Sequence, residues 1–222
     1  NVVKKMIEAY LSLLTDVDIE VYEPNIAYKQ VLKEQYNDSK LTNARAMLLY
    51  ALYFYEMSDE RTNLVVANKL CYFLKLTGDK SFARMNFVRQ NYGPYSHAVG
   101  YLLKNVNGKY IHGLEELDAK PFEMLSLEYS TKQEVVDYVH NMSSVQKSNL
   151  SAVLKLIDGF ESAFAMEILA TVAYIMNESP GINLQSVINE VGLWSDRKKR
   201  LFSEEVIALA YNRLLLCKWV TN

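Results

Sequence analysis

The strongest constraint on the fold of this chain is the spacing of its apolar residues, which recur three and four positions apart over most of its length. The spacing is clearest over residues 43–57, 62–77, 161–177 and 203–217. It places apolar side chains on one face of a helix, as in a helix packed against a core. Glycine and proline are scarce, with 8 and 4 among 222 residues, which disfavours a turn-rich β protein. The sequence therefore predicts a mainly α-helical domain.

The middle of the chain breaks this pattern with turn signals and short alternating segments. We expect short strands, turns and one helix at residues 85–90, 109–112 and 123–129 (strands), 91–94 and 107–108 (turns) and 95–106 (helix). Glu134 follows Thr131 by three residues, a capping box that predicts a helix start at Thr131. The expected fold class is mainly α with a small β element (α+β). One option for the C-terminal helices is a winged-helix-like arrangement.

The N-terminal residues have a separate character. Residues 1–14 carry a helical apolar stripe, and Val17–Val21 alternate with acidic residues like a half-buried strand. Because one helix and one strand cannot bury both their faces alone, we interpret residues 1–24 as the end of a preceding domain. Residues 25–41 are polar and patternless, which indicates a linker, and residues 42–222 are expected to form one domain.

The composition excludes several classes of protein. A chain that is 50% hydrophobic with a net charge of −2 is not intrinsically disordered. Cys71 and Cys217 are too few for a disulfide framework and suit a reducing cytoplasm. The longest apolar run, residues 46–55, is about half of the roughly 20 residues that a membrane span needs. We therefore expect a cytoplasmic protein with no membrane partner.

A search for catalytic and metal-binding patterns predicts neither a metal nor a cofactor. His97, His112 and His140 are isolated from one another and from the cysteines, so no pair has metal-ligand spacing. Cys71 lies inside an apolar helical pattern, where a buried structural thiol is favoured over a nucleophile. Nucleotide-binding and hydrolase motifs are also missing from the sequence.

A stiff turn, Asn91-Tyr92-Gly93-Pro94-Tyr95, is the first of three stretches that can carry recognition. Gly93 permits a positive φ and Pro94 fixes its own, so the turn holds Tyr92 and Tyr95 in defined directions. Tyrosine serves both interfaces and interiors. A rigid recognition loop and a turn that fills the core are therefore equally good interpretations.

The second and third stretches are charged. Residues 112–137 hold seven acidic residues, among them Glu115, Glu116 and Asp118, against two lysines, a local charge of −5. Such a face either meets a basic groove or is simply solvated, and solvation is the commoner case. The basic run at residues 197–200 suggests a DNA-reading winged helix, or else a structural role. The slightly acidic chain favours the structural role, so direct nucleic-acid binding is not expected.

Taken together, these stretches resemble a known family. Asn68–Leu74, Asn86-Phe87, Asn91–Tyr95 and Gly108–Gly113 are similar in order to motifs of the C-terminal domain of the DNA ADP-ribosyl glycohydrolase antitoxins, the DarG family. The similarity continues through residues 159–172, 194–202 and 214–219, where Lys218 stands in place of the family's usual glycine. The residues that carry this structural signature are Lys69, Tyr72, Phe73, Gly93, Pro94, Gly113, Trp194 and Trp219.

The resemblance implies a bacterial, cytoplasmic antitoxin domain. The family's partner is a DarT-type toxin, which attaches ADP-ribose from NAD to thymine bases in single-stranded DNA, and the C-terminal domain binds and blocks it. The tyrosine and glycine-proline motifs also resemble the broader Panacea antitoxin domain. Residues 1–24 resemble the last helix and strand of the macrodomain that precedes this domain in cis. Because the earlier catalytic segments of that macrodomain are missing from this sequence, we expect that the chain is not an enzyme.

The resemblance also suggests how inhibition works. A toxin that takes single-stranded DNA should have a basic groove and surfaces on which bases stack. An inhibitor of that groove needs negative charge and flat rings, a form of DNA mimicry. The candidate toxin-binding residues are Tyr92, Tyr95, Tyr110, Glu115, Glu116 and Asp118. The alternative is a DNA-binding, winged-helix-like regulatory module that uses the basic run at residues 197–200.

Overall fold

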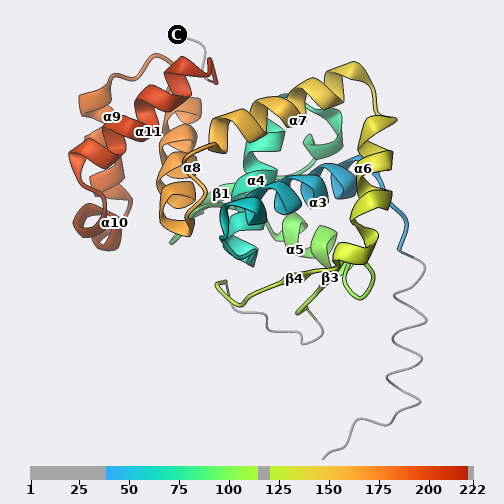
Figure 1. Cartoon of the computed structure of the whole chain (residues 1–222). Coiled ribbons are helices and arrows are strands. Elements are labelled where there is room, and N and C mark those ends of the chain that lie inside the picture. Colours follow the sequence, from blue (N-terminus) through green and yellow to red (C-terminus); the bar gives the residue numbers. More distant parts are fainter. Residues whose placement is uncertain (1–38, 115–120, 220–222) are drawn as a thin grey trace, which may run out of the picture. The chain divides into compact units, whose positions relative to one another are not determined.

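The computed structural model describes residues 39–114 and 121–219, and Figure 1 shows the arrangement of their elements. The chain divides between residues 35 and 36, and every described residue belongs to the second unit. Its elements are, in chain order, α3 (Asn43–Tyr55), η1 (Glu56–Ser58), α4 (Leu64–Leu76), η2 (Lys80–Phe82), β1 (Val88–Gln90), β2 (Gly93–Tyr95), α5 (His97–Lys104), β3 (Ile111–His112), β4 (Ser126–Leu127), η3 (Tyr129–Thr131), α6 (Lys132–His140), α7 (Ser144–Ile157), α8 (Ala163–Glu178), α9 (Leu184–Trp194), α10 (Asp196–Leu201) and α11 (Glu204–Leu216). Helices with two small antiparallel sheets confirm the predicted fold class.

Most helices begin where the sequence supplies a side chain that accepts a hydrogen bond from the first turn. Thr42, Asn63 and Ser162 precede α3, α4 and α8, and each accepts from the backbone N–H three residues further on. Asn183 and Ser203 act in the same way at α9 and α11. These side chains satisfy donors that the helix itself leaves unpaired.

Helix α4 lies at the centre of the unit. Every residue from Val65 to Leu74 is buried, so this stretch has no face toward solvent. The helix contacts α3, α5, α7, α8 and strand β2. Buried polar groups need hydrogen-bond partners, and the two polar residues in this run, Asn68 and Lys69, both bond to the backbone of residues 94–96.

Strands β1 and β2 form a hairpin that packs on α4 and α8. Val88 pairs with Tyr95 and Gln90 pairs with Gly93, which leaves a two-residue loop. The sequence placed the turn over residues 91–94 and began a helix at Tyr95, and both boundaries are wrong. Gly93, with φ of +94°, already belongs to the second strand, and α5 begins two residues after Tyr95.

The second sheet pairs Ile111 with Leu127, within the two regions where the sequence predicted strands. The predicted capping box before α6 is wrong. The Thr131 backbone is itself helical and its hydroxyl donates to the Glu128 carbonyl. The Glu134 carboxylate accepts from Tyr110 and Lys109 instead of capping the helix. Contacts with residues distant in sequence, Lys109 and Tyr110, therefore bind the Glu134 carboxylate that the local motif predicted to cap the helix.

The C-terminal third is helical, as the apolar spacing predicts. Figure 1 shows α9, α10 and α11 gathered beside α8, and α8 also contacts α4. The basic run at residues 197–200, which the sequence suggested to be a turn, lies within the short helix α10. Between residues 163 and 219 the structure describes no strand, so the winged-helix option lacks its wing. Helix α7 was not anticipated.

Three sequence interpretations lie outside the described residues. They are the macrodomain remnant at residues 1–24, most of the linker at residues 25–41, and the acidic residues Glu115, Glu116 and Asp118. The domain boundaries accordingly stay predictions. In the part of the chain that the structure describes, no helix is long and apolar enough to cross a membrane.

Candidate functional site

The candidate site is built where the β1–β2 hairpin meets α4. The ammonium of Lys69 is buried and donates a hydrogen bond of 2.8 Å to the carbonyl of Pro94. The side chain of Asn68 accepts a hydrogen bond of 2.9 Å from the backbone N–H of Ser96. These two bonds join consecutive residues of the central helix to the chain that carries Gly93. The hairpin is therefore fixed from within the core.

Gly93 makes the close approach of hairpin and helices possible. A Cβ atom at this position would lie 3.0 Å from Oγ1 of Thr171 and 3.4 Å from Nζ of Lys69. A side chain is thus disfavoured both by the positive φ and by space. Glycine at this position therefore allows the hairpin backbone to pack directly against Lys69 of α4 and Thr171 of α8.

A pocket of about 340 Å³ opens beside this junction. Its wall includes Tyr92, Tyr95 and His97, with the rings of Tyr95 and His97 packed edge to face at 5.1 Å. The remaining lining residues are Leu64, Val65, Asn68, Lys69, Gln90, Asn91, Gly93 and Pro121. Pockets with mostly apolar walls and a few polar groups are typical of binding sites.

The surroundings of Lys69 lower the pKa of its amine. Burial and the nearby positive charge of Lys198 lower the pKa of Lys69 to about 7, although the carboxylate of Glu167 acts in the opposite direction. Desolvation disfavours the charged form of a buried lysine. Near neutral pH the Lys69 amine therefore exists in both protonation states, with the Pro94 carbonyl as its acceptor.

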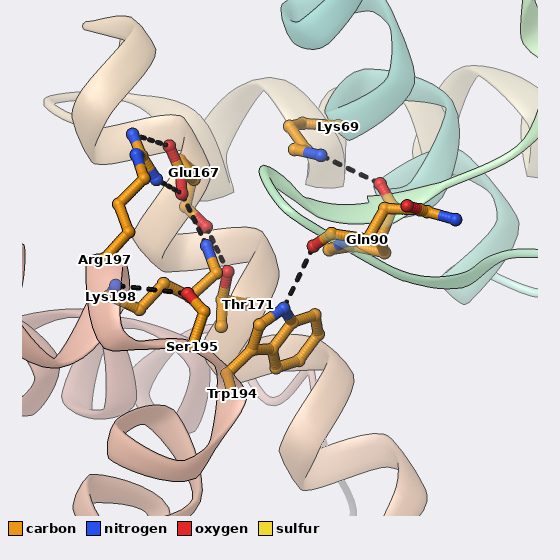
Figure 2. Close-up of polar contacts among 9 residues, drawn as sticks. Lys69, Gln90, Glu167, Thr171, Trp194, Ser195, Arg197 and Lys198 are labelled. Carbon is orange, nitrogen blue, oxygen red and sulfur yellow. Dashed lines mark hydrogen bonds and ion pairs between the residues drawn. The ribbon is translucent and has the colours of Figure 1, made fainter.

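Glu167 organises the polar side of this junction (Figure 2). It lies in α8 and is buried, and its Oε1 and Oε2 accept from the two terminal nitrogens of Arg197 at 2.6 and 3.1 Å. The fully buried ammonium of Lys198 donates to Oε1 at 2.5 Å. Hydrogen bonding to Glu167 raises the pKa of Arg197, whereas burial lowers the pKa of Lys198. One carboxylate therefore holds helix α10 against α8.

The same helix reaches the hairpin through aromatic contacts. The guanidinium of Arg197 lies 5.0 Å from the centre of the Tyr92 ring, and Tyr92 packs edge to face on Phe122 at 4.6 Å. The indole of Trp194 donates to the Gln90 carbonyl at 3.0 Å, as Figure 2 shows. Arg89 lies 4.5 Å from the Trp194 ring. Strand β1 and the hairpin loop are therefore bound to the C-terminal helices.

The structure brings only part of the predicted toxin-binding set together. Tyr92 and Tyr95 are half-buried and line one pocket. Tyr110 lies elsewhere and is completely buried, with its hydroxyl donating to Glu134 at 2.6 Å. The prediction that Tyr110 contacts the toxin at the surface is wrong, because its ring is part of the core. Glu115, Glu116 and Asp118 lie outside the described residues.

The signature residues are structural. Lys69, Tyr72, Phe73, Gly93, Pro94 and Trp194 are all buried. Phe73 packs edge to face on Trp219 at 6.0 Å, which joins the end of the described chain to α4. Gly113 has φ of +111°, and a Cβ there would lie 3.0 Å from the Met124 carbonyl. These side chains hold the scaffold together.

The four residues of the basic run at 197–200 have two different environments. Arg197 and Lys198 are held by Glu167, while Lys199 and Arg200 are exposed. This favours the structural role for half of the run and leaves a small footprint for DNA phosphates. Cys71 is buried as expected, and burial raises the pKa of its thiol.

Sequence reasoning missed Glu167 and Phe122. A single carboxylate in the otherwise apolar helix of residues 163–176 was the available signal, because buried acidic residues are rare unless paired. Phe122 gave no signal, since its contact with Tyr92 depends on the fold. Across residues 39–114 and 121–219 no group of three or more His, Cys, Asp or Glu side chains is placed to hold a metal ion.

Comparison with known proteins finds three similar proteins that share one name. Proteins named DNA ADP-ribosyl glycohydrolase from Mycobacterium bovis (strain BCG / Pasteur 1173P2) and Mycobacterium tuberculosis are each 25% identical to this chain over 229 residues, covering 97% of it. A Thermus aquaticus protein of the same name is 26% identical over 215 residues, covering 96% of the chain. Over nearly its whole length the chain is thus similar to proteins of the DNA ADP-ribosyl glycohydrolase (DarG) family. It spans 64% of the length of the mycobacterial relatives and 58% of the Thermus relative. No family model matches the chain.

The similarity to these relatives confirms the resemblance found in the sequence and corrects one expectation drawn from it. We expected that the chain is not an enzyme, and this is wrong. The DarG relatives are named as hydrolases, and their alignments cover 96–97% of the chain, so nearly all of it has a counterpart in a hydrolase.

Proposed function

We propose that this chain works within a DNA ADP-ribosyl glycohydrolase antitoxin and that its helical unit binds and inhibits a DarT-type DNA ADP-ribosyltransferase. The observation that carries the proposal is the placement of Tyr92 and Tyr95 at one pocket on a hairpin that the signature residues hold rigid. Tyrosines on a rigid element suit protein recognition, because few rotamers are lost on binding. The name of the relatives supports the hydrolase context.

The mechanism we propose is occlusion of the toxin's single-stranded-DNA groove. Such grooves combine positive charge with ring-stacking surfaces. Tyr92 and Phe122 supply flat rings, and Phe122 is 46% exposed. Glu115, Glu116 and Asp118 supply negative charge in the sequence just before Pro121, which lines the pocket. Complementary charge would speed association and fix the register of the two proteins.

The experiment mixes the full chain with purified DarT-type toxin, NAD and a thymine-containing single-stranded oligonucleotide. We expect the chain to suppress ADP-ribosylation of the oligonucleotide in proportion to complex formation, measured by calorimetry. Binding should weaken as salt rises, because an acidic face meeting a basic groove is screened. Absence of both binding and suppression would refute the proposal.

A charge-reversal pair tests the acidic contribution. The double variant Glu115→Lys and Glu116→Lys should bind the toxin more weakly and with a flatter salt dependence. The matched control reverses Glu178 and Glu190, exposed acidic residues at the end of α8 and in α9. It changes the net charge equally, so the two variants separate local from global electrostatics. Equal behaviour of test and control would contradict DNA mimicry by the acidic segment.

A further inference from the structure

A basic face lies where the end of α9 and helix α10 meet strand β1. Three arginines form it, Arg89 in β1 and Arg197 and Arg200 in α10, and we call these side chains the arginine face. We propose that the arginine face binds single-stranded nucleic acid, with phosphates on the guanidinium groups and bases stacked on their planes and on the neighbouring rings. This inference does not rest on the proposed function, and its tests need no toxin.

The local charge at this face differs from that of the whole chain. Residues 88–95 and 196–201 hold five basic residues and one acidic residue, and Glu167 of α8 adds a second negative charge, so five positive charges against two give +3. The whole chain carries −2, which disfavours nucleic-acid binding. A polyanion responds to the local potential, however, and the fold adds Arg89 to a basic run that alone makes a small footprint.

One carboxylate cannot neutralise the arginine face. Glu167 accepts from both Arg197 and the buried Lys198, so it compensates only one of these two positive charges. In the part of the chain that the structure describes, no carboxylate pairs with Arg89 or Arg200. A guanidinium has five N–H donors, and the two bonds to Glu167 leave three of those on Arg197 for phosphate oxygens.

Two of the three guanidinium groups rest on aromatic rings. Arg89 lies over the Trp194 ring, 4.5 Å from its centre, and Arg197 lies 5.0 Å from the centre of the ring beneath it, that of Tyr92. Cation–π contacts of this kind hold a guanidinium in place. The Arg197 side chain remains 41% exposed, and the plane of an arginine stacks well on an unpaired base. Phe122, 46% exposed and packed on Tyr92, extends the surface with a further ring.

The two arginines that rest on rings belong to one surface. Trp194 donates to the Gln90 carbonyl at 3.0 Å, which fixes the end of α9 to β1 (Figure 2). Burial lowers the pKa of Lys198, and the positive charges of Arg197 and Arg89 both act on this amine in the same direction. Both guanidinium groups are therefore close to one buried amine.

Helix α10 carries its exposed basic residues on two sides. Arg197 and Arg200 are three positions apart and thus share one side of the helix. Lys199 lies on another side, toward α9, because its Cγ would be 4.0 Å from a Cβ added at Gly192. Lys199 therefore has the same charge as Arg200 and stands in the same helix, but it lies outside the arginine face.

The rings decide which polyanion fits best. An acidic peptide would satisfy the charges but offers no flat bases to the guanidinium planes and to Phe122. A duplex hides the faces of its bases in the stack, and the described C-terminal residues lack the wing of a winged helix. A single strand supplies both phosphates and unstacked bases, the combination that basic surfaces with rings bind.

The first test measures binding of the full chain to a fluorescein-labelled oligothymidylate of about 12 nucleotides by fluorescence anisotropy. We expect affinity to fall with salt with a slope of about −2 in log K against log salt, because three arginines neutralise about three phosphates of a single strand. A duplex of the same length and a polyglutamate peptide should compete poorly. Absence of binding at low salt, or equal competition by either of these polyanions, would refute the inference.

Single substitutions test the face itself. Arg200→Gln and Arg89→Gln should each weaken binding about fivefold at about 0.1 M salt and flatten the slope by about 0.7, the contribution of one phosphate contact to a single strand. Lys199→Gln is the matched control and should change neither quantity. Thermal melting of each variant separates folding from binding. Equal effects of Lys199→Gln and Arg200→Gln would show general electrostatics and overturn the arginine face.

The variant Phe122→Ala separates stacking from charge. Loss of one stacked base should weaken oligothymidylate binding about fivefold or more, while the salt slope stays the same. Unchanged affinity in this variant would leave charge alone and overturn the assignment to a single strand. Because no toxin takes part, failure of the proposed function leaves these outcomes unchanged, and failure here leaves toxin inhibition untouched.

Discussion

Replacement of Gly93 by alanine tests the packing at the centre of the site. The residue has φ of +94°, where a side chain is strained by about 1–3 kcal/mol. Its new Cβ would also lie 3.0 Å from Oγ1 of Thr171, closer than ordinary contact. The entropy that alanine removes from the unfolded chain offsets about 0.4–1 kcal/mol. We therefore expect Gly93→Ala to lower the free energy of unfolding by about 2–3 kcal/mol.

Gly78→Ala supplies the matched control. Gly78 has φ of +78°, but a Cβ there would meet no atom within 4 Å, so alanine at this position carries backbone strain alone. Urea unfolding followed by circular dichroism should give a loss of about 1 kcal/mol for this control. The difference between the two variants measures the contact with Thr171 and Lys69. Equal losses would refute the steric account, as would failure of Thr171→Ala to reduce the extra cost of Gly93→Ala.

Three other predictions concern single residues. Lys218, with φ of +55°, ends α11 where its backbone N–H donates to the Leu215 carbonyl, so Lys218→Gly should raise the unfolding free energy by about 0.5–1 kcal/mol in a urea titration. Burial lowers the pKa of Lys69 to about 7 in the folded state, so the unfolded chain binds more protons above that pH. Stability should therefore rise between pH 7 and about 10 relative to Lys69→Met, and parallel pH profiles of the two proteins would contradict this. Tyr110→Phe removes the bond to Glu134 and should cost about 1–2 kcal/mol of stability in the same titration, while calorimetry should show unchanged toxin affinity.

The helices were predictable because their signals are local. Apolar spacing alone located α4, α8 and α11, with their starts placed to within two residues. The boundaries failed where a distant partner decided the outcome. Glu134 follows Thr131 by the three positions of a capping box, yet its carboxylate accepts hydrogen bonds from Tyr110 and Lys109 instead.

Only the part of the candidate site that lies within one sequence motif, residues 91–95, could be predicted. Tyr92 and Tyr95 stand three positions apart on one stiff loop, so sequence proximity placed them together. Tyr110 was grouped with them through its motif, although its ring lies in the core. The Glu167–Arg197 pair joins residues 30 positions apart in sequence, and no local pattern carries such a contact.

The inward orientation of the signature residues has a consequence for how relatives are compared. Lys69, Phe73, Gly93 and Pro94 face the interior rather than solvent, so a shared signature reports a shared scaffold. Under the proposed function, this signature carries no information about which toxin the protein binds. Partner choice must then be encoded in exposed positions such as Phe122, which can diversify without disturbing the hydrogen bonds beneath them. If the proposed function holds, two proteins with identical signatures can accordingly bind different toxins.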